Sequence, residues 1–144
     1  ILRQEYRVNT AIWSVTSFNE LRREALEIAR WNMLHPDPPT KQSHVEVCLQ
    51  GNNGPVIAAT DYMKIYADQI REFVPGRYHV LGTDGFGRSD TREKLRHFFE
   101  VDRYYVVVAA LKMLSDEGKI AAALVTEAMQ KYRIDPDKPN PATK

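Results

Sequence analysis

The sequence predicts an α/β domain, because short strand-like runs alternate with longer segments of helical periodicity. Three runs rich in β-branched or aromatic residues occupy residues 11–16, 55–60 and 78–83. Each run is bounded by polar or turn residues, and a helical segment follows each one. We therefore expect neighbouring strands of a largely parallel sheet. The length of 144 residues corresponds to one domain.

The first two predicted helices follow the first two runs. After the first run, Leu21, Ala25 and Ile28 share one helical face. The second run ends at Thr60 and Asp61, either of which can accept a hydrogen bond from the start of a helix. The apolar positions of this second helix are Met63, Tyr66, Ala67, Ile70 and Val74, and Pro75 with Gly76 ends it.

The third run leads into a glycine-rich turn and then into another helix. This helix carries Leu95 and Phe98 on its apolar face. Either Ser89 or Asp90 can cap it, and Asp90 with Glu93 three residues later forms a loose capping box.

Two segments fit more than one structure. Residues 104–108 are β-branched and aromatic enough for a strand, but helical spacing continues to Leu114 and Gly118 can end a helix, so we prefer a helix. Residues 44–49 satisfy both strand alternation and helical spacing, and both interpretations stay open. A last helix is expected from its one-sided apolar residues, which are Ala121, Val125, Ala128, Met129 and Tyr132.

Prolines mark an internal loop and a tail. Three of them between residues 36 and 39 bar a helix there. Pro136, Pro139 and Pro141 favour an extended tail that lies on a surface. We therefore expect one domain over residues 1–144, with a compact core at 10–134 and a proline-rich tail at 135–144.

Composition and charge exclude several classes of protein. Hydrophobic residues make up 43% and charged residues 27%, as in ordinary globular domains. The formal net charge of +1 is too small for the cationic surface that nucleic acid requires. Without a long apolar run, and with a charged start, the chain is expected to be cytoplasmic and not bound to membranes. Cys48 is the only cysteine, which excludes an internal disulfide.

The glycine-rich turn is the clearest candidate for binding chemistry. Gly82, Gly85 and Gly87 stand between a strand and a helix, where backbone N–H groups can hold an anion. Their G-x-x-G-x-G order matches neither the dinucleotide fingerprint nor the lysine-bearing P-loop. A tight turn that needs glycine is the simpler interpretation, and Arg88 keeps anion binding open.

Other candidate residues are few. The four histidines lack metal-motif spacing, and no serine stands in a nucleophile elbow. Aromatic residues cluster at Phe98, Phe99, Tyr104 and Tyr105, where core packing and a protein interface are both reasonable interpretations. From the residues alone, no complete active site is predicted.

Several longer strings, in fixed order, resemble the C-terminal part of the homodimeric pyruvate dehydrogenase component. They are WSVTSF at 13–18, RWNMLHP at 30–36, ATDYMK at 59–64, VLGTDGFGRSD at 80–90, FEVD at 99–102 and YVVVAAL at 105–111. A sparser pattern, from Phe86 through Leu95 to Ala110, is similar to the C-terminal domain of transketolases, the wider superfamily. The resemblance covers nearly the whole chain from Trp13 onward.

This resemblance implies a fold for the chain. The transketolase C-terminal-domain-like fold is a three-layer α/β arrangement, a mostly parallel sheet with one antiparallel strand and helices on both faces. It also implies helices at residues 43–50 and 103–115. One departure is that family members have a helix-length stretch where this chain has only residues 4–9, which implies a shortened first helix or missing residues.

The resemblance also implies a function. The family's enzyme decarboxylates pyruvate on thiamine diphosphate with magnesium and passes the acetyl group to a lipoyl group on the acyltransferase component of the complex. Other domains of that enzyme hold the cofactor, the metal and the catalytic residues, so none is expected in this chain, which alone should be inactive. Its implied partners are those domains, a second subunit of the homodimer and the acyltransferase.

We expect functional contacts at two places in the chain. The first is the loop at the carboxyl end of the third strand, where crevices of open α/β sheets form. It consists of Asp84, Gly85, Phe86, Gly87, Arg88, Ser89 and Asp90. The second is Tyr104 with Tyr105, expected to touch another domain or subunit. The competing hypotheses are a free-standing domain that binds a small anion or nucleotide, and the equivalent domain of a transketolase.

Overall fold

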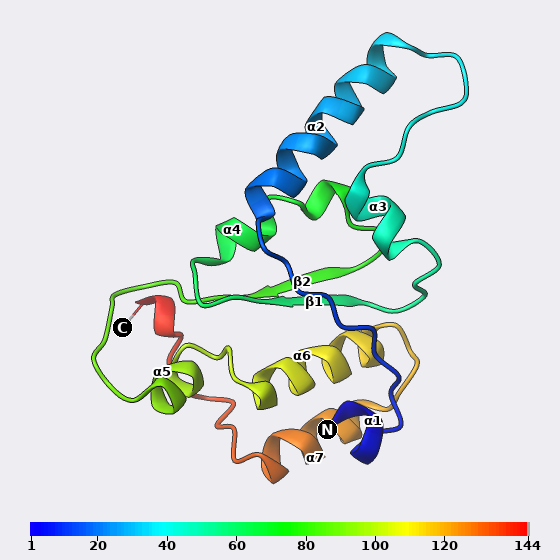
Figure 1. The fold of residues 1–144 in the computed structure, drawn as a ribbon. Helices are drawn as coiled ribbons and strands as arrows, with labels where there is room; N and C mark the ends of the chain where they lie inside the picture. Colours follow the sequence, from blue (N-terminus) through cyan, green and yellow to red (C-terminus); the bar gives the residue numbers. More distant parts are fainter. Residues whose placement is uncertain (144) are drawn as a thin grey trace.

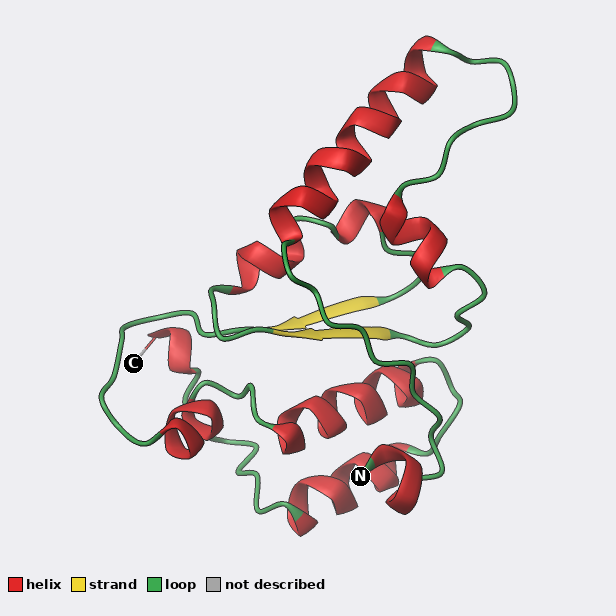
Figure 2. Cartoon of the chain, viewed as in Figure 1, coloured by secondary structure: helices red, strands yellow, loops and turns green. Residues whose placement is uncertain are grey.

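In the computed structural model, which describes residues 1–143, a small sheet lies between two layers of helices (Figures 1 and 2). Strands β1 (Val56–Ala59) and β2 (Tyr78–Leu81) are parallel, with Val56 opposite Tyr78. The α/β class and the parallel pairing of these two runs are confirmed. No helix within residues 1–143 is both long and apolar enough to cross a membrane.

The two helical layers cover opposite faces of the sheet (Figure 1). One layer contains α2 (Phe18–Leu34), α3 (His44–Leu49) and α4 (Lys64–Asp68). The other contains α1 (Leu2–Glu5), α6 (Arg103–Asp116) and α7 (Ala122–Lys131). A separate helix, α5 (Arg92–Phe98), lies beyond the end of the sheet, close to the tail.

Each layer has its own apolar core, as burial of large side chains requires. The core above the sheet joins α2, α3 and α4 to both strands through Ala25, Val45, Leu49, Ala67, Ile70, Phe73, Val74, Tyr78 and Val80. The core below joins α6 and α7 through Val107, Leu111, Val125 and Ala128, with side chains from residues 1–8 packed against it. The sheet is thus covered on both faces, as expected.

Side-chain caps explain where the two helices before β1 begin. The Ser17 hydroxyl accepts a hydrogen bond from the Glu20 N–H at the start of α2. Ser43 and Glu46 form a complete capping box at the start of α3, and Ser43 is fully buried. Because this box satisfies N–H groups that a strand would not offer, residues 44–49 form a helix. The helix implied for them by the family resemblance is confirmed.

The crossover from β1 to β2 is shorter and more irregular than its sequence predicts. After α4 the chain forms a 3-10 turn over Arg71–Phe73 instead of continuing one long helix. Ala67, Ile70 and Val74 are buried as expected, but Met63 and Tyr66 are exposed. The predicted apolar face is therefore correct only in its second half.

The cap of α5 differs from the prediction. Neither Ser89 nor Asp90 is the capping residue; the Thr91 hydroxyl accepts the hydrogen bond from the Lys94 N–H. Asp90 instead accepts from the N–H of Thr91, 2.7 Å away, one residue before the helix. The expected capping box with Glu93 is therefore wrong, because threonine one residue later takes the role.

The first residues of the chain are fastened to α7. The Tyr6 and Tyr132 hydroxyls are 2.9 Å apart, and the Glu5 carboxylate accepts from both Tyr132 and Lys131 at 2.8 Å. Burial, together with these hydrogen bonds, raises the pKa of Tyr132. This clasp, formed by Glu5, Tyr6, Lys131 and Tyr132, holds α1 on the lower layer.

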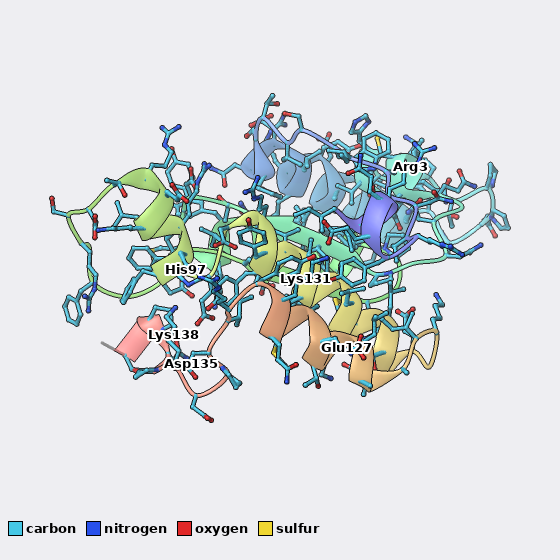
Figure 3. The ribbon with its side chains drawn as sticks, turned by 90° about the horizontal axis from the view of Figure 1, so that it is seen from below. Arg3, His97, Glu127, Lys131, Asp135 and Lys138 are labelled. Carbon is cyan, nitrogen blue, oxygen red and sulfur yellow. The ribbon has the colours of Figure 1, made fainter. Side chains whose placement is uncertain are left out.

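The tail folds back against α5 and the loop before it. Pro141 is buried and starts a 3-10 turn, Pro141–Thr143, so this part of the tail is not extended. The Lys138 ammonium donates to the carbonyl of Phe98 at 2.6 Å and to the Glu100 carboxylate at 3.2 Å. Figure 3 labels Lys138 beside His97 on this side of the molecule. The tail therefore lies on a surface, as expected.

Two expectations about the sheet are wrong. Residues 11–16 are extended but form no strand, and all six are exposed. Within residues 1–143 the sheet has two strands, both parallel, and the antiparallel strand implied by the family resemblance is not found. The run at 11–16 has strand-forming residues, but a strand also needs a hydrogen-bonded neighbour, and none pairs with it here.

Candidate functional site

The expected functional loop, residues 84–90, leaves the carboxyl end of β2 and is anchored to the end of β1. The Thr83 hydroxyl donates to the Asp61 carbonyl at 2.9 Å, and the Asp84 carboxylate accepts from the Lys64 N–H at 3.0 Å. These bonds join the residues that follow both strands. The loop is thus placed at the strand ends, where open α/β sheets form crevices.

Two glycines are required by close approaches at this end of the sheet. A Cβ on Gly82 would lie 2.8 Å from the backbone nitrogen of Lys64. Gly85 has a φ of +103°, and a Cβ there would lie 2.6 Å from the carbonyl oxygen of Pro141 in the tail. Gly87 meets no such neighbour. The glycines at 82 and 85 therefore serve backbone packing, which supports the simpler interpretation of this turn.

A groove of about 470 Å³ lies between the loop and α5. We call it the arginine groove; its lining includes Asp61, Thr83, Gly85, Gly87, Arg88, Asp90, Arg92, Leu95, Arg96, Phe99 and Val101. Against it lies a smaller hollow of about 280 Å³ that shares Arg88 and Asp90. Thus Gly85, Gly87, Arg88 and Asp90, four of the seven expected loop residues, line the groove.

The charges of the arginine groove are partly paired. Arg96 donates to the two Asp61 carboxylate oxygens, at 2.8 and 3.3 Å. These hydrogen bonds, with the charges of Arg96 and Arg92, lower the pKa of Asp61. The Arg88 guanidinium stacks on the ring of Phe98, 4.1 Å from its centre. Within residues 1–143 no ion pair engages Arg88 or Arg92, so the groove presents both cations to a neighbouring surface.

The remaining loop residues are exposed. The Phe86 side chain is 78% exposed, and Ser89 is exposed beside the smaller hollow. Large exposed apolar side chains next to unpaired arginines are the residue types enriched in protein interfaces. The loop and groove therefore have the chemistry of a contact surface.

Tyr104 and Tyr105 lie at the start of α6 and are half-buried within the chain. Tyr104 stacks on Tyr132 of α7, with ring centres 4.8 Å apart. Tyr105 packs against His97, 5.5 Å away, and burial raises its pKa to about 12. Their rings are used in internal packing, and only Tyr105 lies near the tail, through Lys138.

Sequence reasoning missed several groove residues and found others. Arg92 and Arg96 were not singled out, although Arg88, Arg92 and Arg96 recur at intervals of four, the spacing of one helical face. Asp61 was considered only as a helix cap. Its pairing with Arg96 joins residues 35 positions apart, and no local pattern reveals such a contact.

The residues present do not fit a thiamine diphosphate or magnesium site. Within residues 1–143 no group of three or more histidine, cysteine or acidic side chains is arranged to hold a metal ion. In the arginine groove, Asp61 is already bound by Arg96 and Asp90 is within 3.7 Å of Lys94. No catalytic step is derived from this groove.

Comparison with known proteins places these features in context. Residues 1–102 match the family model of the transketolase-like C-terminal domain. The chain is 61% identical over 142 residues to the pyruvate dehydrogenase E1 component of Pseudomonas aeruginosa. It is 57% identical over 141 residues to that of Cupriavidus necator and 51% identical over 142 residues to that of Escherichia coli. Each alignment covers 98% of this chain but only 16% of the relative.

Proposed function

We propose, from the premise that this chain belongs to the transketolase-like C-terminal domain family, that it acts as the C-terminal domain of a pyruvate dehydrogenase E1 component. The observation that carries the proposal is the identity of 51% to 61% to three such components over almost the entire chain. The role we assign to the domain is structural: it supports the other domains of the same polypeptide and takes part in contacts between subunits.

The activity belongs to the larger protein in this proposal. The whole enzyme would decarboxylate pyruvate on thiamine diphosphate with magnesium and transfer the acetyl group to a lipoyl group of the acyltransferase component. The cofactor, the metal and the catalytic residues would be held by other domains, and the enzyme would be a cytoplasmic homodimer. Residues 1–144 would form one domain of it.

Within this domain, the loop at 84–90 and the arginine groove are our proposed contact surface. Phe86 offers exposed apolar area, and Arg88 and Arg92 offer cations without a partner within residues 1–143. A surface of another domain or subunit that carries carboxylates would complement them. Tyr104 and Tyr105 would support this surface indirectly, through α6 and the tail.

A chimeric enzyme tests the proposal. Residues 1–144 would replace the matching part of the Pseudomonas aeruginosa E1 component, and pyruvate decarboxylation and lipoyl acetylation would be measured in the reconstituted complex. We expect both activities, with the isolated chain inactive in the same assays. An equally folded chimera that forms no active enzyme would contradict the proposal. The control is the same exchange with the corresponding part of the Escherichia coli relative.

The competing hypotheses are not favoured. A free-standing domain for small anions or nucleotides would not explain why the matched relatives carry the name of one enzyme component. The same names argue against the equivalent domain of a transketolase.

A further inference from the structure

The extended residues 9–16 have the character of a strand without a partner. No hydrogen bond within residues 1–143 engages their backbone N–H or carbonyl groups. Ile12 is 91% exposed, Trp13 54% and Val15 41%. In an extended chain, Ile12 points to one side, and Trp13 and Val15 point to the other. Apolar side chains on both sides are typical of a strand buried inside a parallel sheet.

Strand β1 has a free edge of the same kind. The N–H groups of Val56 and Thr60 donate to carbonyls of the β2 segment, at 2.8 and 3.0 Å. Because backbone groups alternate in direction along a strand, the N–H groups of Ile57 and Ala59 point to the opposite edge. Outside the β1–β2 pairing, no hydrogen bond within residues 1–143 engages these two residues.

The outer edge of β2 differs from that of β1. The Arg71 guanidinium donates to the carbonyl of Tyr78 at 2.7 Å, on the side of β2 that faces away from β1. Tyr78, Val80 and Leu81 are buried, whereas no residue of β1 is fully buried. The sheet is therefore closed at β2 and open at β1.

The handedness of the connections fixes where residues 11–16 lie. Figure 1 draws them as the dark-blue trace that passes in front of the strands, between the two helical layers. They lead through α2 and α3 to β1, and β1 leads through α4 to β2, in the same helical layer. Since parallel crossovers are right-handed, both steps move in one direction across the sheet. Residues 11–16 therefore lie on the β1 side, away from β2.

Helix α1 belongs to the opposite layer, where Ile1 and Leu2 pack on the core of α6 and α7. A right-handed crossover through that layer moves in the reverse direction across the sheet. A parallel strand that enters α1 would therefore stand between residues 11–16 and β1. This position has an unpaired backbone edge on each side.

We propose that this position is a slot for one parallel β-strand, contributed by another part of the longer polypeptide to which the chain belongs. The strand would be apolar on both faces, because helices cover the sheet above and below. It would pair with Ile57 and Ala59 on one side and with residues 11–16 on the other. Residues 11–16 would then become a strand, and Trp13 and Val15 would be covered.

The length of the relatives supports a source within the same polypeptide. This chain spans only 16% of each matched E1 component, so most of the residues of such a protein lie outside it. A strand that enters the sheet directly through α1 needs no second molecule. The inference uses the proposed function only in taking an E1 component as the source of the strand.

Amide hydrogen exchange measured by NMR tests the slot. One sample is the 144-residue chain. In the other, the residues that directly precede the matched part of the Pseudomonas aeruginosa component are fused ahead of Ile1. In the unfused chain we expect Ile57 and Ala59 to exchange at least about 100-fold faster than Ala58, which faces β2. In the fused chain we expect slow exchange at Ile57, Ala59 and residues 11–16 together.

A fusion with the same residues in scrambled order is the matched control, and it should leave these amides fast. Slow exchange at Ala58 in every sample shows that β1 and β2 are paired, so a folding defect would be recognised. The slot is overturned if Ile57 and Ala59 stay fast in the native-order fusion, if only one of the two edges becomes slow, or if the scrambled fusion protects them equally. None of these readouts depends on enzymatic activity, so the result is independent of the chimera test.

Discussion

Gly85 is the residue at which the loop and the tail come closest. Its positive φ and its contact with the Pro141 carbonyl oxygen both exclude a side chain. We predict that Gly85→Ala lowers the free energy of unfolding by about 1–3 kcal/mol, because alanine is strained at this φ and its Cβ would overlap the tail. Urea unfolding followed by circular dichroism measures the change.

Gly87→Ala is the matched control for this prediction. It stands two residues away in the same loop, and its added Cβ would have no heavy atom within 4 Å. We expect a change within about 0.5 kcal/mol, as at ordinary surface positions. Equal losses in the two variants would show that the tail contact does not decide the effect.

Asp61 gives the groove a pH-dependent contribution to stability. Hydrogen bonds from Arg96 hold its pKa below the ordinary value of 3.8. A lowered pKa in the folded state stabilises the protein above the unfolded pKa, and this contribution disappears as the pH falls through the folded value. Because the carboxylate is 62% exposed, we expect only about 0.2–1 kcal/mol.

We therefore predict that Asp61→Asn is less stable than the unmodified chain at pH 6 by this small amount. The difference should shrink below about pH 4 and vanish near pH 2, where the carboxylate is protonated in both states. Urea unfolding across this range, with and without 0.5 M salt (about the concentration that screens exposed pairs), measures it. Asp37→Asn, in the exposed proline loop, should show no such trend; a difference for Asp61→Asn that grows at low pH would contradict the assignment.

At the scale of elements, Asp102 connects α5 to α6. Its carboxylate accepts from the N–H groups of Tyr104 and Tyr105, at 2.8 and 3.0 Å, and lies 2.9 Å from Nδ1 of His97. We predict that Asp102→Ala lowers the free energy of unfolding by about 1–2 kcal/mol, because the first turn of α6 loses its cap. Asp102→Asn retains an acceptor oxygen and should lose clearly less. Thermal unfolding of both variants decides, and equal losses would be inconsistent with capping.

The elements that could be predicted from sequence are those whose signals are local. The helix implied at 43–50 is confirmed, and Ser43 with Glu46 provides its complete cap within four residues. The strands at 56–59 and 78–81 are confirmed because each is short, apolar and next to the other in the sheet. Residues 11–16 carry equally strong strand propensity, yet they do not form a strand. Pairing depends on a neighbour, and the local sequence does not contain that information.

At the scale of the molecule, the tail connects the loop to α5 and α6. Lys138 is 19% exposed and touches the carbonyls of residues 97 and 98, the Glu100 carboxylate and the rings of Phe98 and Tyr105. We predict that Lys138→Met speeds amide exchange in residues 140–143 about tenfold, because it removes charge-assisted hydrogen bonds worth about 1.5–3 kcal/mol. Lys94→Met, at an exposed pair, should leave the tail unchanged. Unaltered exchange in Lys138→Met would show that Pro141 alone holds the tail.

The candidate site could be predicted only in part for the same reason. The loop at 84–90 is visible in sequence because glycines mark the turn after a strand. The arginine groove is assembled from the ends of two strands, a helix and the loop, so Asp61 and Arg96 meet only in the folded chain. The position of the tail on Gly85 was equally hidden, because no sequence pattern links Gly85 to Pro141.

The clasp between Glu5, Tyr6, Lys131 and Tyr132 has a consequence for the order of folding. Its hydrogen bonds join residues 126 and 127 positions apart. Closing so long a loop carries a large entropic penalty until the intervening chain is already compact, so contacts of this separation form late. The β1–α4–β2 unit, by contrast, closes over about 20 residues. The N-terminal turn is therefore expected to dock after the sheet has formed, and to be the first part to detach when the molecule unfolds.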